Sequence, residues 1–225
     1  KILDIMCGFV ILLKKKSNTP WWNKKISRIF SDLSKINKHR GPDTINIKNT
    51  KKYSAIARRL QIYDSSTESN LLFTNKNKKI KIYYNGSIYN FLELKEELIK
   101  YGHKFKTKLD TEVIIKCYEQ FGLKFIKKIR GMFSLVIFDD NLKKIFLFRD
   151  PLGQKPLYYC KIKIGFVISS EIKDILYIKK QSNEKNLEND NTVFKYLLRG
   201  WTDDTNQTFY KNILSFPAGS YGEVN

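Results

Sequence analysis

The stretch GMFSLVIFDDNLKKIFLFRD (131–150) decides the fold, because it contains two apolar runs separated by a short polar turn. The runs 131–139 and 144–150 are rich in β-branched and aromatic residues, and DNLK joins them, which predicts a β-hairpin. Apolar residues fill most positions of both runs instead of every second position. We therefore expect the hairpin to belong to a sheet that is covered on both faces.

Further strands and amphipathic helices are predicted on both sides of the hairpin, from the spacing of apolar residues. The predicted strands are 8–13, 53–64, 79–84, PLYYC (156–160) and GFVISS (165–170), of which the last two are expected to continue the hairpin's sheet. The predicted helices are 24–36, 90–102, 110–122, 171–178 and 193–200. This order predicts an α+β protein with two mainly antiparallel sheets, consistent with a layered sandwich.

Polar and glycine residues mark the ends of two predicted helices. Asn90 and Asp110 are expected to act as N-caps, and Gly102 and Gly122 to end the helices. The Asp110 carboxylate has an alternative role, since it could face an ammonium group. The polar segment 179–191 predicts a linker or a long surface loop.

The composition excludes several classes of protein. Of 225 residues, 42% are hydrophobic and 28% charged, which is typical of a globular domain. No apolar run approaches the roughly 20 residues of a spanning helix, so no membrane partner is expected. The spacing of Cys7, Cys117 and Cys160 fits neither a disulfide framework nor a zinc site, and His39 and His103 lack metal-ligand spacing. We expect no metal and a reducing, cytoplasmic location.

The net charge of +20 raises the question of nucleic-acid binding. Only seven of the 42 basic residues are Arg, whereas proteins that read bases and phosphates rely on Arg. The lysines are also spread over every segment of the chain. A solvated basic surface is therefore favoured and no nucleic acid is expected as a partner, with a nucleic-acid binder as the alternative.

Polar residues at strand ends and turns are the candidates for chemistry. Cys7 follows Met6 directly, so it is either a buried strand residue or the first residue of a mature enzyme. Arg59 suits bidentate binding of a carboxylate, or else is an exposed edge residue. Asn85 and Gly86 form either a tight turn or a pair of hydrogen-bond donors for a developing oxyanion.

In this order, eight motifs resemble the class II glutamine amidotransferase domain of glutamine-hydrolysing asparagine synthetases. The motifs are MCGF (6–9), HRGPD (39–43), RRLQIYD (58–64), YNGSIYN (84–90), GHKFKTKLDTEV (102–113), GMFSLVIFD (131–139), RDPLGQKPLYY (149–159) and SSEIKDIL (169–176). The resemblance covers nearly the whole chain, and HRGPD and RDPLGQKPLYY are its most specific motifs. It implies an N-terminal-nucleophile hydrolase fold, a four-layer αββα sandwich of two mainly antiparallel sheets.

The resemblance also implies the chemistry. Cys7, as the first residue of the mature chain, would attack the side-chain amide of L-glutamine, with its own α-amino group as the base. Asn85 and Gly86 would form the oxyanion hole, Arg59 would hold the substrate α-carboxylate and Asp110 its α-ammonium group. The remaining substrate contacts are expected from Leu60, Ile62, Asn85 and Ser87. The loop 39–43 would support the nucleophile without taking part in the chemistry.

The same resemblance implies a glutaminase domain over 7–190 and a connecting segment over 191–225 that leads to an ATP-dependent synthetase domain. That domain, in cis or in trans, would use ATP and Mg²⁺, whereas the glutaminase domain needs no cofactor. The family commonly has Glu where this chain has Ser87 and a small polar residue where it has Leu109. A catalytically inactive glutamine-binding module and another class II amidotransferase, for instance for amino-sugar synthesis, therefore stay alternatives, and a homodimer is possible.

Overall fold

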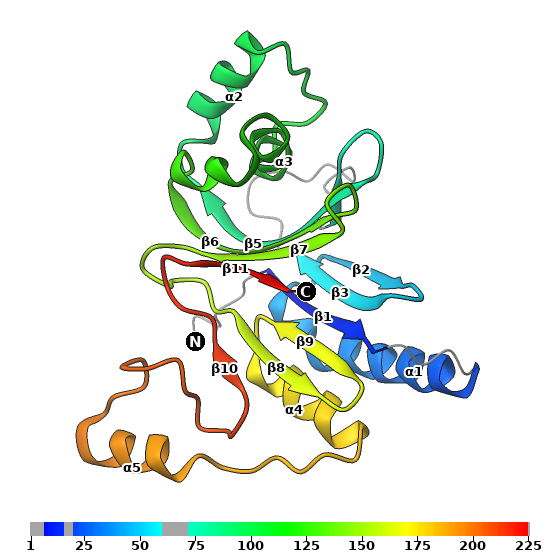
Figure 1. Cartoon of the computed structure of the whole chain (residues 1–225), viewed down its shortest axis with the longest axis vertical. Coiled ribbons are helices and arrows are strands. Elements are labelled where there is room, and N and C mark those ends of the chain that lie inside the picture. The colour runs from blue at the N-terminus through cyan, green and yellow to red at the C-terminus, as the bar shows by residue number, and fades with distance from the viewer. Residues whose placement is uncertain (1–6, 16–19, 60–71, 225) are drawn as a thin grey trace. The chain divides into compact units, whose positions relative to one another are not determined.

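The chain forms two compact units, and each contains one antiparallel sheet with its own helices (Figure 1). The computed structural model describes residues 7–15, 20–59 and 72–224. The first unit consists of residues 1–60 and 156–217, and the second of residues 61–155 and 218–225.

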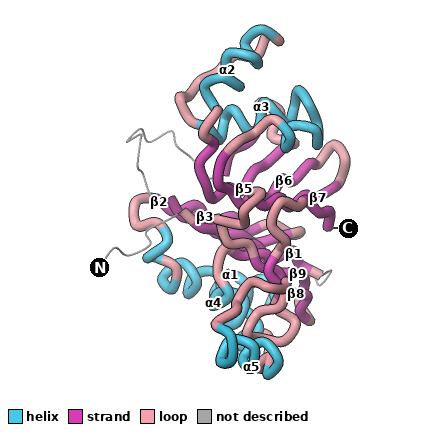
Figure 2. The backbone as a smooth tube through the Cα atoms, turned by 90° about the vertical axis from the view of Figure 1, so that its left-hand side faces the viewer, coloured by secondary structure: helices cyan, strands magenta, loops and turns pink. Residues whose placement is uncertain are grey.

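The sheet of the first unit has six strands in the order β10-β8-β9-β1-β3-β2. These strands are β1 (Gly8–Lys14), β2 (Thr44–Asn49), β3 (Tyr53–Arg59), β8 (Tyr158–Ile162), β9 (Gly165–Ser169) and β10 (Leu214–Ser215). The helices are α1 (Pro20–Ile36), the short 3-10 helix η1 (Lys38–Arg40), α4 (Ile172–Gln181) and α5 (Asp190–Arg199). Helices α1 and α4 lie along the same face of the sheet (Figure 2).

The core of the first unit follows from the spacing of apolar residues in α1. Ile26, Ile29 and Leu33 recur every three to four positions, so they share one helix face and are buried. They pack with alternate residues of the central strand β1, Val10 and Leu12, in one apolar cluster. This packing holds β1 in the middle of the sheet, between β3 and β9.

The sheet of the second unit has five strands in the order β11-β7-β6-β5-β4. These strands are β4 (Leu72–Thr74), β5 (Ile80–Ile88), β6 (Gly131–Asp139), β7 (Lys144–Arg149) and β11 (Tyr221–Val224). The helices are α2 (Phe91–Lys100), α3 (Asp110–Phe121) and the 3-10 helix η2 (Gly122–Lys127). The predicted hairpin is confirmed, because β6 and β7 pair along their length.

Both faces of this second sheet are buried, as its apolar strands predict. Leu135 and Ile137 of β6 pack with α2 and α3 in one apolar cluster. The alternate residues Val136 and Phe138 lie on the opposite face and are buried as well. Because both faces of the sheet are shielded from solvent, apolar residues at consecutive strand positions are all buried.

The structure excludes one of the alternatives left open for the strands and contradicts one prediction. Asn85 and Gly86 do not make a turn after the strand 79–84, because β5 continues through them and pairs with β6 as far as Ile88. The strands PLYYC and GFVISS do not continue the hairpin's sheet, because β8 and β9 join the sheet of β1. Cross-strand pairing with partners distant in sequence overrides the local turn preference of Asn-Gly in the first case.

Asn90 is the N-cap residue of α2, as predicted, whereas the predicted cap Asp110 is wrong, and both glycine terminators are confirmed. The Asn90 side chain makes no capping bond; instead, its Nδ2 donates to the Lys128 carbonyl oxygen at 2.9 Å and its Oδ1 accepts from Arg130 N at 2.8 Å. Asp110 is the first residue inside α3, and the cap position is Leu109. Gly102 and Gly122 follow their helices with φ of +87° and +54°.

The C-terminal segment 191–225 contributes to both units. Helix α5 and strand β10 belong to the first unit, whereas β11 pairs with β7 in the second. The division at residue 190 between a domain and a connecting segment stays a prediction.

A buried carboxylate organises the turn after β7. Asp150 is 1% exposed, and its two oxygens accept hydrogen bonds from four backbone N–H groups. The donors are Phe133 at 3.2 Å, Leu152 at 3.1 Å, Gln154 at 2.9 Å and Lys155 at 3.0 Å. Charge-assisted bonds of this kind hold the RDPLGQK segment against β6.

We expect Asp150→Asn to lower the free energy of unfolding by about 2–4 kcal/mol, because an amide NH₂ cannot accept from the N–H groups that face it. Urea unfolding followed by tryptophan fluorescence measures the change. Asp140→Asn is the control, since the Asp140 side chain is 50% exposed and its surface ion pair with Lys81 contributes less than about 1 kcal/mol. Equal unfolding midpoints for the two variants would contradict this role of Asp150.

Candidate functional site

Cys7 and Arg59 lie at neighbouring strand ends in the first unit. Cys7 directly precedes β1, is half-buried and forms no disulfide. Arg59 is the last residue of β3 and is also half-buried. The antiparallel register pairs Gly8 with Arg58, so its continuation by one residue brings Cys7 opposite Arg59. The structure therefore brings together the predicted nucleophile and the predicted carboxylate-binding residue.

The HRGPD loop packs against both of these strand ends. A Cβ atom at Gly41 would lie 2.5 Å from the backbone N of Arg59, so only glycine allows the loop to approach so closely. Arg58 Nη1 donates to the Gly41 carbonyl oxygen at 3.1 Å, and burial lowers the pKa of this guanidinium. Gly8 in turn lies against the Arg40 side chain. The loop thus has the supporting position that the sequence predicts.

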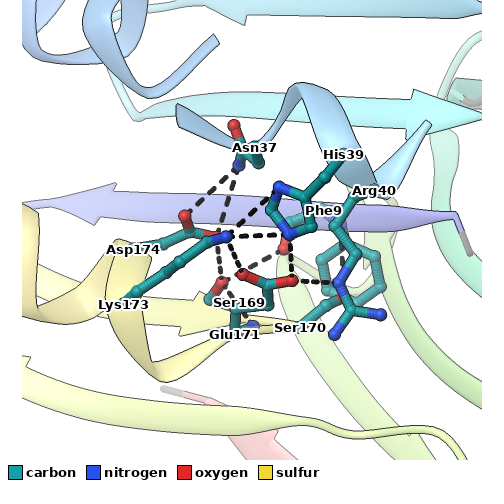
Figure 3. A network of polar contacts seen from close by, with 9 residues as sticks. All are labelled: Phe9, Asn37, His39, Arg40, Ser169, Ser170, Glu171, Lys173 and Asp174. Carbon is teal, nitrogen blue, oxygen red and sulfur yellow. Dashed lines mark hydrogen bonds and ion pairs between the residues drawn. The ribbon is translucent and has the colours of Figure 1, made fainter. Parts of the chain in front are cut away.

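The start of β1 is also fixed by hydrogen bonds to the segment before α4 (Figure 3). Phe9 N donates to Ser170 Oγ at 3.1 Å, and Ser170 N donates to the Phe9 carbonyl oxygen at 2.9 Å. The neighbouring Ser169 Oγ donates to Asp174 at 2.8 Å, and Asn37 Nδ2 donates to the same carboxylate at 3.3 Å. The strand that follows Cys7 is therefore held through side chains of SSEIKDIL.

Glu171 joins that segment to the HRGPD loop. Its carboxylate contacts His39 Nε2 at 2.7 Å and Lys173 Nζ at 2.8 Å, and it also binds Arg40 Nε (Figure 3). Burial alone would raise the pKa of Glu171, but the hydrogen bonds from Lys173 and His39 and the Arg40 charge outweigh it and lower this pKa. Sequence reasoning missed this network because His39 and Arg40 lie more than 130 residues before Glu171.

Asp174 in the same network is almost fully buried. Burial raises its pKa to about 6, against the effect of the hydrogen bond from Ser169, which lowers it. The charged form of Asp174 therefore opposes folding, whereas the charged form of Glu171 is favoured.

Asn85 and Gly86 lie side by side in β5 of the second unit. Asn85 is 1% exposed, and its Nδ2 has no hydrogen-bond partner among the residues that the structure describes. A Cβ atom at Gly86 would lie 2.2 Å from the Met132 carbonyl oxygen, so glycine is needed for β5 to approach β6. A buried amide without an acceptor is costly, and such a donor can bind an anionic oxygen of a ligand.

Asp110 joins the start of α3 to this part of β5. Its carboxylate accepts from Tyr84 OH at 2.7 Å and from Ile88 N at 3.1 Å. Ser87, which pairs with Met132 in β6, is half-buried. The structure therefore places Asp110 beside β5, in contact with the residues on either side of Asn85, Gly86 and Ser87. The predicted residues Leu60 and Ile62 lie outside the described residues.

A hollow of about 540 Å³ lies away from these positions, beside α5 and between Asn189 and Gln207. None of the predicted site residues lines it. Within the described ranges, no group of three or more His, Cys, Asp or Glu side chains could hold a metal ion. The helices in those ranges are all too short or too polar to cross a membrane.

The chain matches the family described as "Glutamine amidotransferase domain" over residues 6–225. It therefore belongs to this family. A likeness in three dimensions is found with the PRPP amidotransferase of B. subtilis, with a TM-score of 0.57, 20% identity, and coverage of 76% of this chain and 43% of the other. This likeness concerns the fold, and the predicted fold class and family are confirmed.

Two curated relatives are named as glutamine-hydrolysing asparagine synthetases. Asparagine synthetase 2 of Bacillus subtilis is 34% identical over 223 residues, which cover 98% of this chain and 29% of the relative. A putative asparagine synthetase 2 of Methanocaldococcus jannaschii is 36% identical over 231 residues, which cover 95% of this chain and 43% of the relative. The chain thus spans less than half the length of either relative.

We expect Gly86→Ala to lower the free energy of unfolding by about 1–3 kcal/mol, because the added methyl group must displace the β6 backbone. The neighbouring Ser87→Ala is the control and should stay within about 0.5 kcal/mol of wild type. Thermal unfolding followed by circular dichroism measures both. A Gly86→Ala variant as stable as Ser87→Ala would show that β5 and β6 tolerate a side chain here.

A second prediction concerns pH. Because the pKa of Asp174 is raised to about 6 on folding, the folded protein holds this proton more tightly than the unfolded chain. Asp174 should therefore lower the free energy of unfolding as the pH rises from about 4 to about 6, by about 3 kcal/mol in total.

Urea unfolding of wild type and Asp174→Asn between pH 4 and pH 7 measures this effect. The stability of the variant relative to wild type should rise between pH 4 and pH 6 and then level off. Asp190→Asn, at a side chain that is 84% exposed, should show no such rise. Parallel pH profiles for wild type and Asp174→Asn would contradict the raised pKa.

Proposed function

We propose that this chain is the glutaminase part of a glutamine-dependent asparagine synthetase. It hydrolyses L-glutamine to glutamate and ammonia through a thioester on Cys7. The observation that carries the proposal is membership of the glutamine amidotransferase family over 6–225, with a half-buried Cys7 at the start of a central strand. The curated relatives are named for the same glutamine hydrolysis.

In the proposed mechanism Cys7 supplies the nucleophile. The Cys7 thiol attacks the amide carbon of glutamine after its proton passes to the free α-amino group of the same residue, whose pKa near 8 suits a base at neutral pH. This step requires that Met6 and the residues before it are removed. Arg59, opposite Cys7 in the strand register, binds the α-carboxylate of the substrate.

Residues of β5 and α3 supply the groups that bind the developing negative charge and the α-ammonium group. The unpartnered Asn85 Nδ2 and the Gly86 N–H donate to the carbonyl oxygen as it becomes anionic. The Asp110 carboxylate accepts hydrogen bonds from the substrate ammonium group, using lone pairs that the bonds from Tyr84 OH and Ile88 N do not occupy. Ser87, Leu60 and Ile62 complete the proposed substrate contacts.

The ammonia acceptor belongs to the proposal as well. Because the relatives are more than twice as long, we assign the ATP-dependent step, with ATP and Mg²⁺, to a synthetase domain in cis or in trans. The glutaminase step itself uses no cofactor in this proposal. The unbridged cysteines and the need for ATP are consistent with a cytoplasmic location.

The test is a glutaminase assay of Cys7→Ala, with the N-terminus of each protein determined by mass spectrometry. We expect wild type with Cys7 at its N-terminus to release ammonia and glutamate, and Cys7→Ala to lose at least about 10³-fold in rate. Cys160→Ala is the matched control, because Cys160 is buried and burial raises its pKa.

Three outcomes would contradict parts of the proposal. Wild-type turnover in Cys7→Ala would exclude Cys7 as the nucleophile. Ammonia release by a protein with residues still attached before Cys7 would exclude the α-amino group as the base. Glutamine binding by calorimetry without turnover in correctly processed wild type would favour an inactive glutamine-binding module.

A further inference from the structure

A row of polar side chains crosses three strands of the second unit on the sheet face opposite to α2 and α3. Asn85 of β5 pairs with Ser134 of β6, and Ser134 pairs with Arg149 of β7. Residues directly opposite in antiparallel strands point to the same face, so these three side chains are neighbours. The next residues along this face, such as Val136 and Leu147, are apolar and buried. The polar row is thus an exception on an apolar surface.

Ser134 shares an unusual property with Asn85. Ser134 is 0% exposed, and in the described ranges neither its Oγ nor Asn85 Nδ2 has a hydrogen-bond partner. A buried polar group without a partner costs about 1–3 kcal/mol. Alanine at position 134 would fit the same space and remove that cost. Two such groups in directly opposed positions indicate that both bind a group that arrives with a ligand.

The third member of the row favours an anionic ligand. Arg149 Nε donates to the Lys155 carbonyl oxygen at 3.0 Å, and Arg149 Nη2 donates to the Gly153 carbonyl oxygen at 2.8 Å. These bonds hold a permanent positive charge at the end of the row. Negative charge that develops beside Ser134 is therefore stabilised by both hydrogen bonds and charge.

We propose that the Ser134 hydroxyl is a further oxyanion donor, acting on the same substrate oxygen as Asn85 Nδ2. The inference rests on the proposed glutaminase function. When the Sγ–C bond forms between Cys7 and the amide carbon, the π-electron pair of the carbonyl moves onto its oxygen. Ser134 donates a hydrogen bond to that oxygen and keeps its own proton, so no other reactant is required. The serine acts on the transition state and contributes little to ground-state binding.

Steady-state glutaminase kinetics of Ser134→Ala, combined with urea unfolding, test the inference. We expect kcat to fall about 10- to 100-fold, somewhat less than for loss of a main oxyanion donor, with KM within about twofold of wild type. The free energy of unfolding should stay equal or rise, because an unsatisfied buried hydroxyl is removed. A structural role for Ser134 would instead lower stability and leave kcat unchanged.

Ser54→Ala is the matched control. Ser54 is also a fully buried strand serine, but its Oγ donates to Asn49 Oδ1 at 2.7 Å. Its replacement should lower stability by about 1 kcal/mol and leave kcat unchanged. The opposite responses of the two serines distinguish a catalytic hydroxyl from a structural one.

The Asn85→Ala/Ser134→Ala double variant tests whether the two groups act on one oxygen. We expect its loss in kcat to be smaller than the product of the two single losses. Fully multiplicative losses, or a kcat of Ser134→Ala within twofold of an active wild type, would overturn the inference and leave the glutaminase proposal intact. An inactive wild type would instead overturn the proposed function itself.

Discussion

Burial of both faces of the second unit's sheet is the constraint on which the rest of the structure depends. In the second unit Val136 and Phe138 are as well buried as Leu135 and Ile137 on the helical face. Water therefore cannot satisfy a polar side chain at the buried positions of these strands, and each such side chain needs a protein partner or a ligand. Asp150 has four donors, whereas Asn85 is left with a free donor group among the described residues. The fold thus separates structural polar groups from those available for chemistry.

The local spacing of apolar residues predicts well which segments are helices and which are strands, but it predicts poorly which strands pair with one another. The hairpin 131–150 is predicted to within one residue of the observed bounds of β6 and β7, because its strands and turn are contiguous. The sheet membership of β8 and β9 could not be predicted, since β9 pairs with β1 about 155 residues away. Periodicity records whether a residue is buried, but it contains no information on which strand lies beside it.

The same limit applies to the site. Asn85 and Gly86 were identified as candidates, but their local preference for a turn gave no sign that β5 runs through them. The ion pairs of Glu171 with the HRGPD loop join this loop to SSEIKDIL, and nothing in the sequence indicates that the two motifs are in contact. Ser134 lay unnoticed within an apolar strand, because a single serine there has no distinguishing pattern until its missing partner is seen.

Both units are built from segments that are far apart in the sequence, so neither sheet can be completed early in synthesis. Strand β1 needs β9 on one side, and β7 receives its neighbour β11 only at residues 221–224. A ribosome that has released the first 150 residues has therefore completed neither sheet, and the Cys7 strand still has an unpaired edge. Such long-range pairing slows folding and leaves an aggregation-prone intermediate during translation. Cys7, which directly precedes β1, is consequently fixed in its final position among the last events of folding.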